Sequence, residues 1–475
     1  PLPFSQLHDP SRMKPLLFFA LTVFASFFVP GFSFAAQPNL ILFLADDLGY
    51  GDLASYGHPL IKTPNLDAFA QQGVRLTQCY SASAVCSPSR SALLTGRTPF
   101  RNGVYTWLAE GGVAHLRTSE ITLPRLLKGA GYATCHSGKW HLNGLFNNLA
   151  QPQPGDHGYD WWMATQNNAG PSHENPSNFV RNGQPVGPLQ GYSAPLVVGE
   201  AITWLKEKRD ASKPFFLAVW THEPHYPIKS DPKFKALYPN LTDDVQREHH
   251  ANVTQLDHAF GLLMKSIDEQ KLTDSTFVFF TSDNGPEGDG ITTPGRGSSG
   301  GLRERKRSMH EGGIRVPGLA RWPGHIKPGT TSDVPVIGSD VFPTMLAIAG
   351  VKPPVDRVLD GVNILPVLTG SVTKLDRPQP LYWRLNMAPN ARVAMRVDDW
   401  KILANAELTE FELYNLKTDA RETNDLKATE PQRFAALRAQ LLKHHAAVEA
   451  EGPDWWRHLG PSGLAKVDGP AVKKG

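Results

Sequence analysis

The chain has 475 residues, of which 40% are hydrophobic and 20% charged, and its formal net charge is +3 at pH 7. That length and composition fit a globular protein with a sizeable core, organised as one large domain and a smaller one. So small a net charge, without a long basic block, argues against a nucleic-acid partner, and three cysteines are too few for a disulfide framework.

The first 36 residues are predicted to be a targeting segment outside the fold. Met13-Lys14 precedes an apolar run at 16–28, and small residues at 33–36 offer a cleavage site. This is the pattern of a secretory signal, and residues 1–12 are interpreted as upstream sequence. The apolar run is short for a membrane span, and no cysteine near the cleavage site could carry a lipid. We therefore expect an exported protein, periplasmic or secreted, without a stable membrane anchor.

Residues 37–370 are predicted to form the larger, α/β domain. Continuous apolar runs, typical of strands buried on both faces, cover 39–45, 215–220 and 276–281. Helical patterns alternate with these runs at 65–72, 123–129, 196–208 and 257–269. Such alternation indicates a large, mostly parallel sheet flanked by helices.

A smaller unit is predicted at 371–475, after a boundary rich in prolines and turn residues at 352–380. Short strand signals follow at 381–384, 391–397, 400–404 and 412–415, and a helical pattern covers 430–450. The tight turns between the strand signals indicate antiparallel pairing, so we expect a C-terminal antiparallel α+β subdomain.

Polar residues end each of the three predicted strands. Asp46 and Asp47 follow the first, the segment 222–225 follows the second, and Asp283 with Asn284 follows the third. Because sites in parallel sheets gather beyond the carboxyl ends of the strands, we expect these groups to meet. Clustered carboxylates repel one another unless they share a cation, and oxygen ligands favour Ca²⁺ or Mg²⁺ over zinc. Taken singly, each pair also occurs in ordinary turns.

Cys86 begins the string Cys-Ser-Pro-Ser-Arg, which we interpret as an exposed turn that leads into a helix. Ser87 is expected to cap the helix, and the proline suits its first turn. Unpaired N–H groups at a helix start, together with Arg90, favour an anion, so a thiol here is predicted to be a low-pKa nucleophile. The alternative is a small buried residue, which is the interpretation given to Cys79 and Cys135.

Basic residues and histidines lie at comparable places. Lys139 and His141 end another apolar stretch, His225 belongs to a His-Tyr-Pro string, and Lys306 lies in a basic run. Each alone is better explained as a solvated charge or a structural histidine. Together they would supply the cations, the base and the acid that transfer of an anionic group requires. The glycine-rich segment 285–301 is either a loop over this edge of the sheet or a solvated connector.

The Cys-x-Pro-x-Arg string, with Leu93-Leu94-Thr95-Gly96-Arg97 after it, resembles the maturation signature of type I sulfatases. Other motifs of that family follow in order and spacing: Asp46 to Gly51, Gly138 to His141, Pro224 to Pro227, Ser282 to Gly285, and Lys306. The resemblance covers residues 37–430 and looks closest to N-acetylgalactosamine-6-sulfatase-like and bacterial glycan sulfatases. It implies an alkaline-phosphatase-like fold and hydrolysis of sulfate esters.

The resemblance also implies a cofactor and a maturation step. In that family the cysteine is oxidised to formylglycine, whose hydrated aldehyde attacks sulfate esters. The expected partners are therefore a sulfated glycan and a formylglycine-generating enzyme or anaerobic maturase. Asp46, Asp47, Asp283 and Asn284 would hold Ca²⁺, with Mg²⁺ as the alternative, joined by an oxygen of the matured Cys86.

Roles in the chemistry are implied in the same way. Arg90 would steady the hydrated aldehyde, while Lys139 and Lys306 would clamp the sulfate oxygens. His141 would accept a proton from the nucleophile. His225 would protonate the leaving alcohol, and the histidine at position 222 is the alternative for that role.

The segment 156–178 combines tryptophans with short polar side chains, the mixture that holds sugars. Its Asn168 and His173 are predicted to bind a sulfated galactose or N-acetylgalactosamine residue, with Arg384 of the small subdomain at the mouth of the site. Alternatively, Trp161 and Trp162 belong to the core.

Two other functions remain open from the sequence. One is a phosphatase or a phosphonate or phosphodiester hydrolase of the same fold, which would more often carry a Thr or Ser nucleophile and a second metal site. The other is a non-catalytic protein that binds sulfated glycans and keeps Cys86 unmodified.

Overall fold

The computed structural model describes residues 37–288, 296–387 and 392–453. The predicted targeting segment, part of the glycine-rich segment, one end of a predicted strand and the last residues of the chain lie outside the described residues. None of the described helices is long and apolar enough to cross a membrane.

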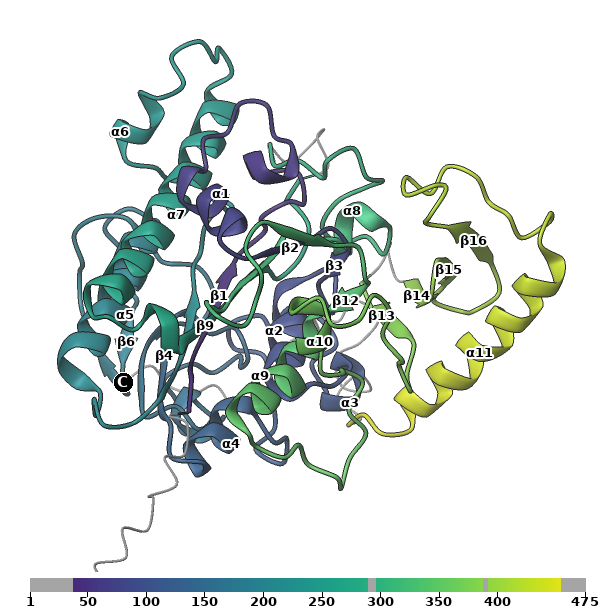
Figure 1. Ribbon diagram of the computed structural model, residues 1–475, viewed down its shortest axis with the longest axis horizontal. Helices are drawn as coiled ribbons and strands as arrows, with labels where there is room; N and C mark the ends of the chain where they lie inside the picture. The colour runs from purple at the N-terminus through teal and green to yellow at the C-terminus, as the bar shows by residue number, and fades with distance from the viewer. Residues whose placement is uncertain (1–36, 289–295, 388–391, 454–475) are drawn as a thin grey trace, which may run out of the picture. The chain divides into compact units, whose positions relative to one another are not determined.

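A mixed, mostly parallel sheet of ten strands forms the centre of the larger domain (Figure 1). In spatial order the strands are β11 (Thr330–Ser332), β2 (Val74–Leu76), β10 (Gly318–Arg321), β9 (Thr276–Ser282), β1 (Asn39–Ala45), β8 (Phe215–Trp220), β4 (Ala133–Lys139), β5 (Trp161–Thr165), β6 (Val180–Arg181) and β7 (Gln184–Pro185). The five strands from β9 to β5 run parallel to one another. At the two sides of this parallel group, β10 pairs with β9 and β6 pairs with β5, both antiparallel.

The central strand β1 shows why these apolar runs become strands. Every residue of β1 is buried, and successive side chains enter opposite cores. Leu40 and Leu42 belong to one hydrophobic cluster, whereas Ile41 and Phe43 belong to the other. A strand between two apolar layers needs apolar residues at every position, which accounts for the continuous pattern.

Helices cover both faces of the sheet (Figure 1). One cluster contains residues of α1 (Pro64–Gln71), α5 (Ser193–Thr203, continued by a π-helical turn at Trp204–Lys208) and α7 (Asp244–Glu269). The opposite cluster contains residues of α2 (Cys86–Thr95), α4 (Leu123–Gly129) and α9 (Val341–Ala349). The predicted strands, sheet and flanking helices are thus confirmed.

Short elements connect these layers. They are the helices α3 (Pro99–Asn102), α6 (Pro232–Lys235), α8 (Glu311–Ile314) and α10 (Leu365–Leu368), the paired strands β3 (Cys79–Tyr80) and β12 (Val336–Ile337), and 3₁₀ turns at Ala54–Tyr56, Pro154–His157, Thr273–Ser275 and Gly338–Asp340. The two other cysteines, Cys79 and Cys135, are buried, as expected.

The helix predicted at 257–269 is only the second half of α7, which begins at Asp244. Asp243 caps it, because its carboxylate accepts hydrogen bonds from the N–H groups of Val245 and Gln246. The first half was missed because buried polar side chains such as His250 interrupt the apolar periodicity.

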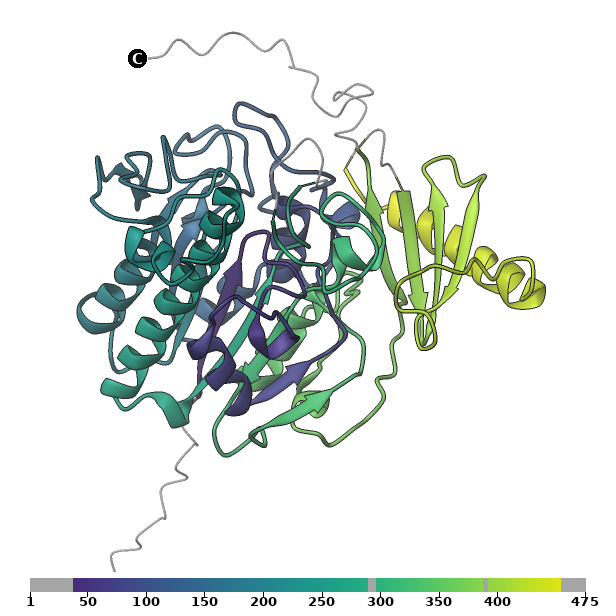
Figure 2. The ribbon, with the colours of Figure 1, turned by 90° about the horizontal axis from the view of Figure 1, so that it is seen from above.

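The C-terminal subdomain is a four-stranded antiparallel sheet with one long helix (Figure 2). Its elements are β13 (Leu381–Leu385), β14 (Arg392–Val397), β15 (Trp400–Asn405), β16 (Phe411–Asn415) and α11 (Pro431–Glu449). One face of this sheet packs on α11 through residues such as Met395 and Leu441. The other face packs on the larger domain, where the Trp383 Nε1–H donates to the Ser81 carbonyl at 2.8 Å. The boundary at residue 370 stays a prediction.

A buried ion network ties the subdomain to α8. The Lys401 side chain is fully buried, and its Nζ lies 2.9 Å from a Glu311 carboxylate oxygen and 2.8 Å from one of Glu422. Glu422 also accepts the Glu311 backbone N–H at 2.7 Å. Burial raises the pKa of Glu311, but the opposite effect of Lys401 and nearby arginines is larger, so the pKa falls to about 2. The ammonium therefore compensates two carboxylates that burial would otherwise destabilise.

Replacement of this ammonium tests the network. Lys401→Met should lower the free energy of unfolding by about 3 kcal/mol or more, because it leaves two buried carboxylates without their cation. Urea denaturation followed by circular dichroism measures the change, and Lys417→Met, at an exposed lysine of the same subdomain, is the matched control. Equal stability of both variants would contradict the assignment.

Candidate active site

The polar residues that end β1 and β9 meet at one edge of the large sheet. The Asp47 backbone N–H donates to Asp283 Oδ1 at 3.1 Å, and the Asn284 Nδ2 group donates to Asp47 Oδ1 at 2.7 Å. The strands are neighbours paired in parallel, so their carboxyl ends lie together. The structure therefore brings together residues that are more than 200 positions apart in the sequence.

Three cations face the three carboxylates at this edge. The ion pairs are Lys139 Nζ to Asp46 Oδ2 at 2.6 Å, Lys306 Nζ to Asp47 Oδ2 at 2.7 Å, and Arg90 Nη2 to Asp283 Oδ2 at 2.7 Å. Their side chains are between 0% and 4% exposed. Such buried charges are retained only where each has a partner, so the site is a compensated cluster of six charges.

Cys86 is the first residue of α2 and is 3% exposed. The expectation of an exposed turn was wrong, as was the expected cap: the Ser87 hydroxyl accepts the Leu108 N–H at 3.0 Å and makes no capping bond. Burial raises the pKa of the Cys86 thiol well above its ordinary value, although Lys139 and Lys306 act in the opposite direction. The predicted low-pKa thiol was therefore wrong, because desolvation outweighs the nearby cations.

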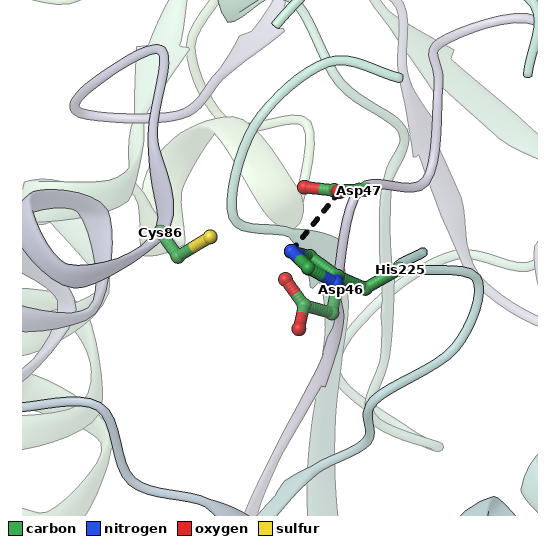
Figure 3. A group of neighbouring side chains, drawn as sticks. All are labelled: Asp46, Asp47, Cys86 and His225. Atoms are coloured by element: carbon green, nitrogen blue, oxygen red, sulfur yellow. Dashed lines mark ion pairs between the residues drawn. The ribbon is translucent and has the colours of Figure 1, made fainter. Parts of the chain in front are cut away.

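Four side chains form a group that could hold a metal ion (Figure 3). Asp46, Asp47, Cys86 and His225 each offer a ligand atom, and these atoms lie within 4.8 Å of one another. The Cys86 thiol points toward this group, and His225 Nε2 lies 3.6 Å from Asp47 Oδ2. Three of these four residues belong to the ligand set predicted from the sequence.

The residues at this edge also fit a hard cation. Asp46 Oδ1 and Asn284 Oδ1 are buried and accept no hydrogen bond from any described residue. Burial and the neighbouring carboxylates raise the pKa of Asp47 well above its ordinary value and that of Asp283 to about 6. A divalent cation would relieve that repulsion and use these two oxygens, of which Asp46 Oδ1 also lies 3.4 Å from Arg90 Nη2. The Asp283 carboxylate is also held by Arg90.

His141 has the geometry of a proton acceptor. Its Nε2 lies 3.1 Å from the Leu108 carbonyl oxygen, and because a carbonyl can only accept, Nε2 must carry the hydrogen. Nδ1 then holds a lone pair, and it is buried without a hydrogen-bond partner among the described residues. Burial, Lys139 and Arg90 keep the pKa of His141 well below its ordinary value, so the ring is neutral.

The backbone at two site residues is unusual. Asp47 and His141 have φ angles of 64° and 56°, in the left-handed region that residues other than glycine rarely adopt. Such conformations persist where the surrounding structure holds them, and they are found mostly at functional sites.

The two histidines near β8 differ in what they contact. His225 lies against Asp47, and its side chain is 14% exposed. His222 is fully buried, and its Nε2 lies 2.8 Å from the Thr165 hydroxyl. His225 therefore contacts the charged cluster and is also open to solvent, whereas His222 has no exposed surface. Burial, then Lys306 and Lys139, lower the pKa of His225.

Sequence reasoning missed Glu287. Its carboxylate accepts from Lys306 Nζ at 2.6 Å and pairs with Arg307, so it shares Lys306 with Asp47. Burial raises its pKa, but the two cations together lower it below the ordinary value. The available signal was an acidic residue three positions after Asn284, which was treated as part of a glycine-rich loop.

The predicted substrate residues lie in three different places. Asn168 Nδ2 donates to the Tyr226 carbonyl at 3.4 Å, beside His225. His173 is fully buried, and neither ring nitrogen has a hydrogen-bond partner among the described residues. Arg384 is not brought to the cluster: its guanidinium pairs with Glu449 of α11 at 2.9 Å.

The family profile described as Sulfatase matches residues 38–351. The chain belongs to the sulfatase family. A second profile, described as N-sulphoglucosamine sulphohydrolase, C-terminal, matches residues 304–450 of this sulfatase. That range runs from the segment that carries Lys306 to α11.

Human N-acetylgalactosamine-6-sulfatase is 39% identical to this sulfatase over 378 residues, which cover 73% of this chain and 69% of the human protein. Human arylsulfatase A is 33% identical over an alignment of 498 residues, which covers 93% of each chain. The solved structure of Ps i-CgsB in complex with k-i-k-neocarrahexaose is similar with a TM-score of 0.77 and 27% identity, over 88% of this chain and 94% of that one.

These likenesses confirm the alkaline-phosphatase-like fold of sulfatases and the resemblance to N-acetylgalactosamine-6-sulfatase and bacterial glycan sulfatases. The chain is a sulfuric ester hydrolase, which decides against the phosphatase alternative and the non-catalytic one.

Proposed function

We propose that this sulfatase removes sulfate from a sulfated galactose or N-acetylgalactosamine residue of a glycan, with formylglycine made from Cys86 and a bound Ca²⁺. The observation that carries the proposal is the set of three buried cations that face Asp46, Asp47 and Asp283 beside Cys86. The names of the relatives support a sulfated sugar: one acts on N-acetylgalactosamine 6-sulfate, and Ps i-CgsB was solved with a neocarrahexaose.

The cations would bind the sulfate group. A sulfate ester spreads its negative charge over several oxygens, and fixed donors aimed at them stabilise charge without having to reorganise. Lys139 and Lys306 are held in place by Asp46 and Asp47, and Lys306 also by Glu287. Arg90 is fixed because its Nε and Nη2 groups both donate to Asp283 Oδ2, at 3.0 and 2.7 Å. The site is therefore organised for an anion before one arrives.

Two histidines would move the protons. His141, neutral and with Nδ1 free, would accept the proton of the nucleophile. His225, partly exposed beside Asp47, would donate a proton to the leaving alcohol, since the negative charge of a bound sulfate ester would raise the pKa that burial and the two lysines lower. Formylglycine, when present, supplies a hydrated aldehyde as the nucleophile. Ca²⁺, when bound by Asp46, Asp47 and the residues that follow β9, supplies positive charge that offsets the charge of the sulfate.

The raised pKa of the Cys86 thiol supports a need for maturation. Burial keeps the thiol protonated at neutral pH, and a protonated thiol is a poor nucleophile. We therefore include a formylglycine-generating enzyme or an anaerobic maturase among the partners, and export to the periplasm or the medium as the location.

Replacing the nucleophile should abolish turnover. Cys86→Ala should hydrolyse no sulfate ester, because alanine has no group that can be oxidised to the aldehyde. Cys86→Ser, expressed without a maturation enzyme, should not turn over either, because a seryl sulfate has no second hydroxyl to expel sulfate. Circular dichroism should show an intact fold for both variants. Mass spectrometry of the wild-type peptide that contains residue 86 should show the lower mass of formylglycine after co-expression with a maturation enzyme. Wild-type turnover by Cys86→Ser, with a peptide mass that shows unmodified serine, would show that the aldehyde is not needed.

Removing the metal should lower activity by about 100-fold or more, because the charge of the sulfate then lacks its compensation. EGTA treatment of the matured enzyme followed by add-back of Ca²⁺ measures this loss. On add-back, Asp46→Asn should regain less activity than Asp398→Asn, which changes an exposed aspartate away from the site. Added Ca²⁺ should also raise the melting temperature of the wild type, since a ligand that binds only the native state stabilises it. Activation by zinc alone would contradict the assignment.

Tyr226 supports a carbohydrate substrate. It directly follows His225, and its side chain is 48% exposed. Among the large hydrophobic residues that are exposed in the described part of the chain, it is the one aromatic residue. An exposed aromatic face beside a polar amide, here that of Asn168, is suited to stacking and hydrogen bonding with a sugar ring.

Tyr226→Ala should raise the KM for a sulfated galactose or N-acetylgalactosamine oligosaccharide by about tenfold, the loss of one good contact. Tyr226→Phe should keep the wild-type value, since it retains the aromatic face. Steady-state kinetics on sulfated oligosaccharides and on simple aryl sulfates measures this. An unchanged kcat/KM on every sulfated sugar, or better activity on simple aryl sulfates than on any sugar, would refute the carbohydrate assignment.

A further inference from the structure

A pocket that contains two arginines lies between the larger domain and the C-terminal subdomain. It has a volume of about 450 Å³ and is lined by Gly301, Arg303, Arg421, Glu422 and Thr423. The first two residues belong to the segment that leads to Lys306, and the others follow β16 in the small subdomain. None of them belongs to the cluster around Cys86.

This pocket is connected to the active-site edge by short, fixed segments. The Gly51 N–H donates to the Ser298 carbonyl at 2.8 Å, and the Ser298 N–H donates to Asp52 at 2.7 Å. Residues 298–303 are thereby attached to the segment that follows Asp46 and Asp47. Arg303 also precedes Lys306 by only three residues. The pocket therefore shares a chain segment with Lys306, one of the cations expected to bind the sulfate.

Arg421 is the free cation of this pocket. It is exposed, and it forms no ion pair with any described residue. Its guanidinium lies over Gly301, where an added Cβ would come within 3.4 Å of Nη2. The guanidinium therefore packs on the backbone at Gly301, and its planar group can present two parallel N–H donors to one anion.

The other charged groups of the pocket are paired within the protein. Arg303 Nη1 donates to the Tyr414 hydroxyl at 3.0 Å and to the Glu422 carbonyl at 2.9 Å, and it forms an ion pair with Glu412 Oε2 at 3.7 Å. The Glu422 carboxylate is 1% exposed and is occupied by Lys401 and by the Glu311 N–H. Its charge is therefore compensated within the protein and does not neutralise Arg421.

We propose that this pocket binds a second anionic group, a sulfate or carboxylate, carried by the same glycan whose sulfate ester is hydrolysed. The substrate class is then a polyanionic glycan with at least two charged groups, one at Cys86 and one at Arg421. This inference rests on the proposed function and adds the charge pattern of its substrate.

Binding to an inactive protein tests the pocket without turnover. Full-length Cys86→Ala is titrated in a calorimeter with galactose- or galactosamine-containing tetrasaccharides that carry one or two sulfates per disaccharide. Adding Arg421→Gln should weaken binding of the disulfated form by about tenfold, the loss of one charge-assisted contact. The monosulfated form should change less, and higher salt should reduce the difference. Arg433→Gln, at an exposed arginine of α11, is the matched control.

The kinetic counterpart uses the matured enzyme. Arg421→Gln should reduce the ratio of kcat/KM for the disulfated over the monosulfated substrate by about tenfold, through KM. An unchanged ratio together with unchanged binding would overturn the inference. Inorganic sulfate serves as a separate probe: if it alone binds Cys86→Ala as tightly as the disulfated sugar does and Arg421→Gln removes it, the pocket is an ion site and the inference also fails. Absence of hydrolysis of any sulfate ester by the wild type would instead refute the proposed function, while the binding titration still decides on the pocket.

Discussion

The structure depends on charge compensation at one buried edge of the sheet. Three carboxylates and three cations lie there almost without solvent, and each of the carboxylates has a cation within 2.7 Å. In a medium of low polarity, removal of one partner upsets the balance of charge, and the remaining set is far less stable than the complete one. The same arrangement that allows these charges to be buried also holds positive groups ready for an anion. Stability and function therefore rely on the same contacts.

The C-terminal subdomain extends this arrangement. The segment that carries Lys306 is held from the subdomain side by several contacts. Arg303 bonds to Tyr414, and His310 lies between Glu304 at 3.0 Å and Glu412 at 3.4 Å. The glutamates raise the pKa of His310 although burial opposes them, so the ring favours its charged form there. The small sheet thus acts as a support for one of the three cations of the site.

Much of this could be predicted from sequence because the relevant signals are local. A strand buried on both faces must be apolar throughout, so β1, β8 and β9 were found within one residue of their ends. The carboxyl-end rule then placed Asp46 and Asp283 together. The sequence could not show which side chains are buried. Desolvation raises the pKa of Cys86, which was expected to be low, and the carbonyl of a residue distant in sequence sets the tautomer of His141. Glu287 and Arg421 were missed because their significance comes from neighbours that only the fold supplies.

The burial of Cys86 has a consequence for the order in which the chain folds and is modified. Cys86 is 3% exposed and begins a helix that is packed inside the larger domain, so a separate enzyme could not reach this thiol in the folded protein. Oxidation of the residue, as proposed, would have to precede completion of the fold. A chain that folds before Cys86 is oxidised would then be stable but inactive. The yield of active protein would therefore depend on the rate of modification relative to the rate of folding.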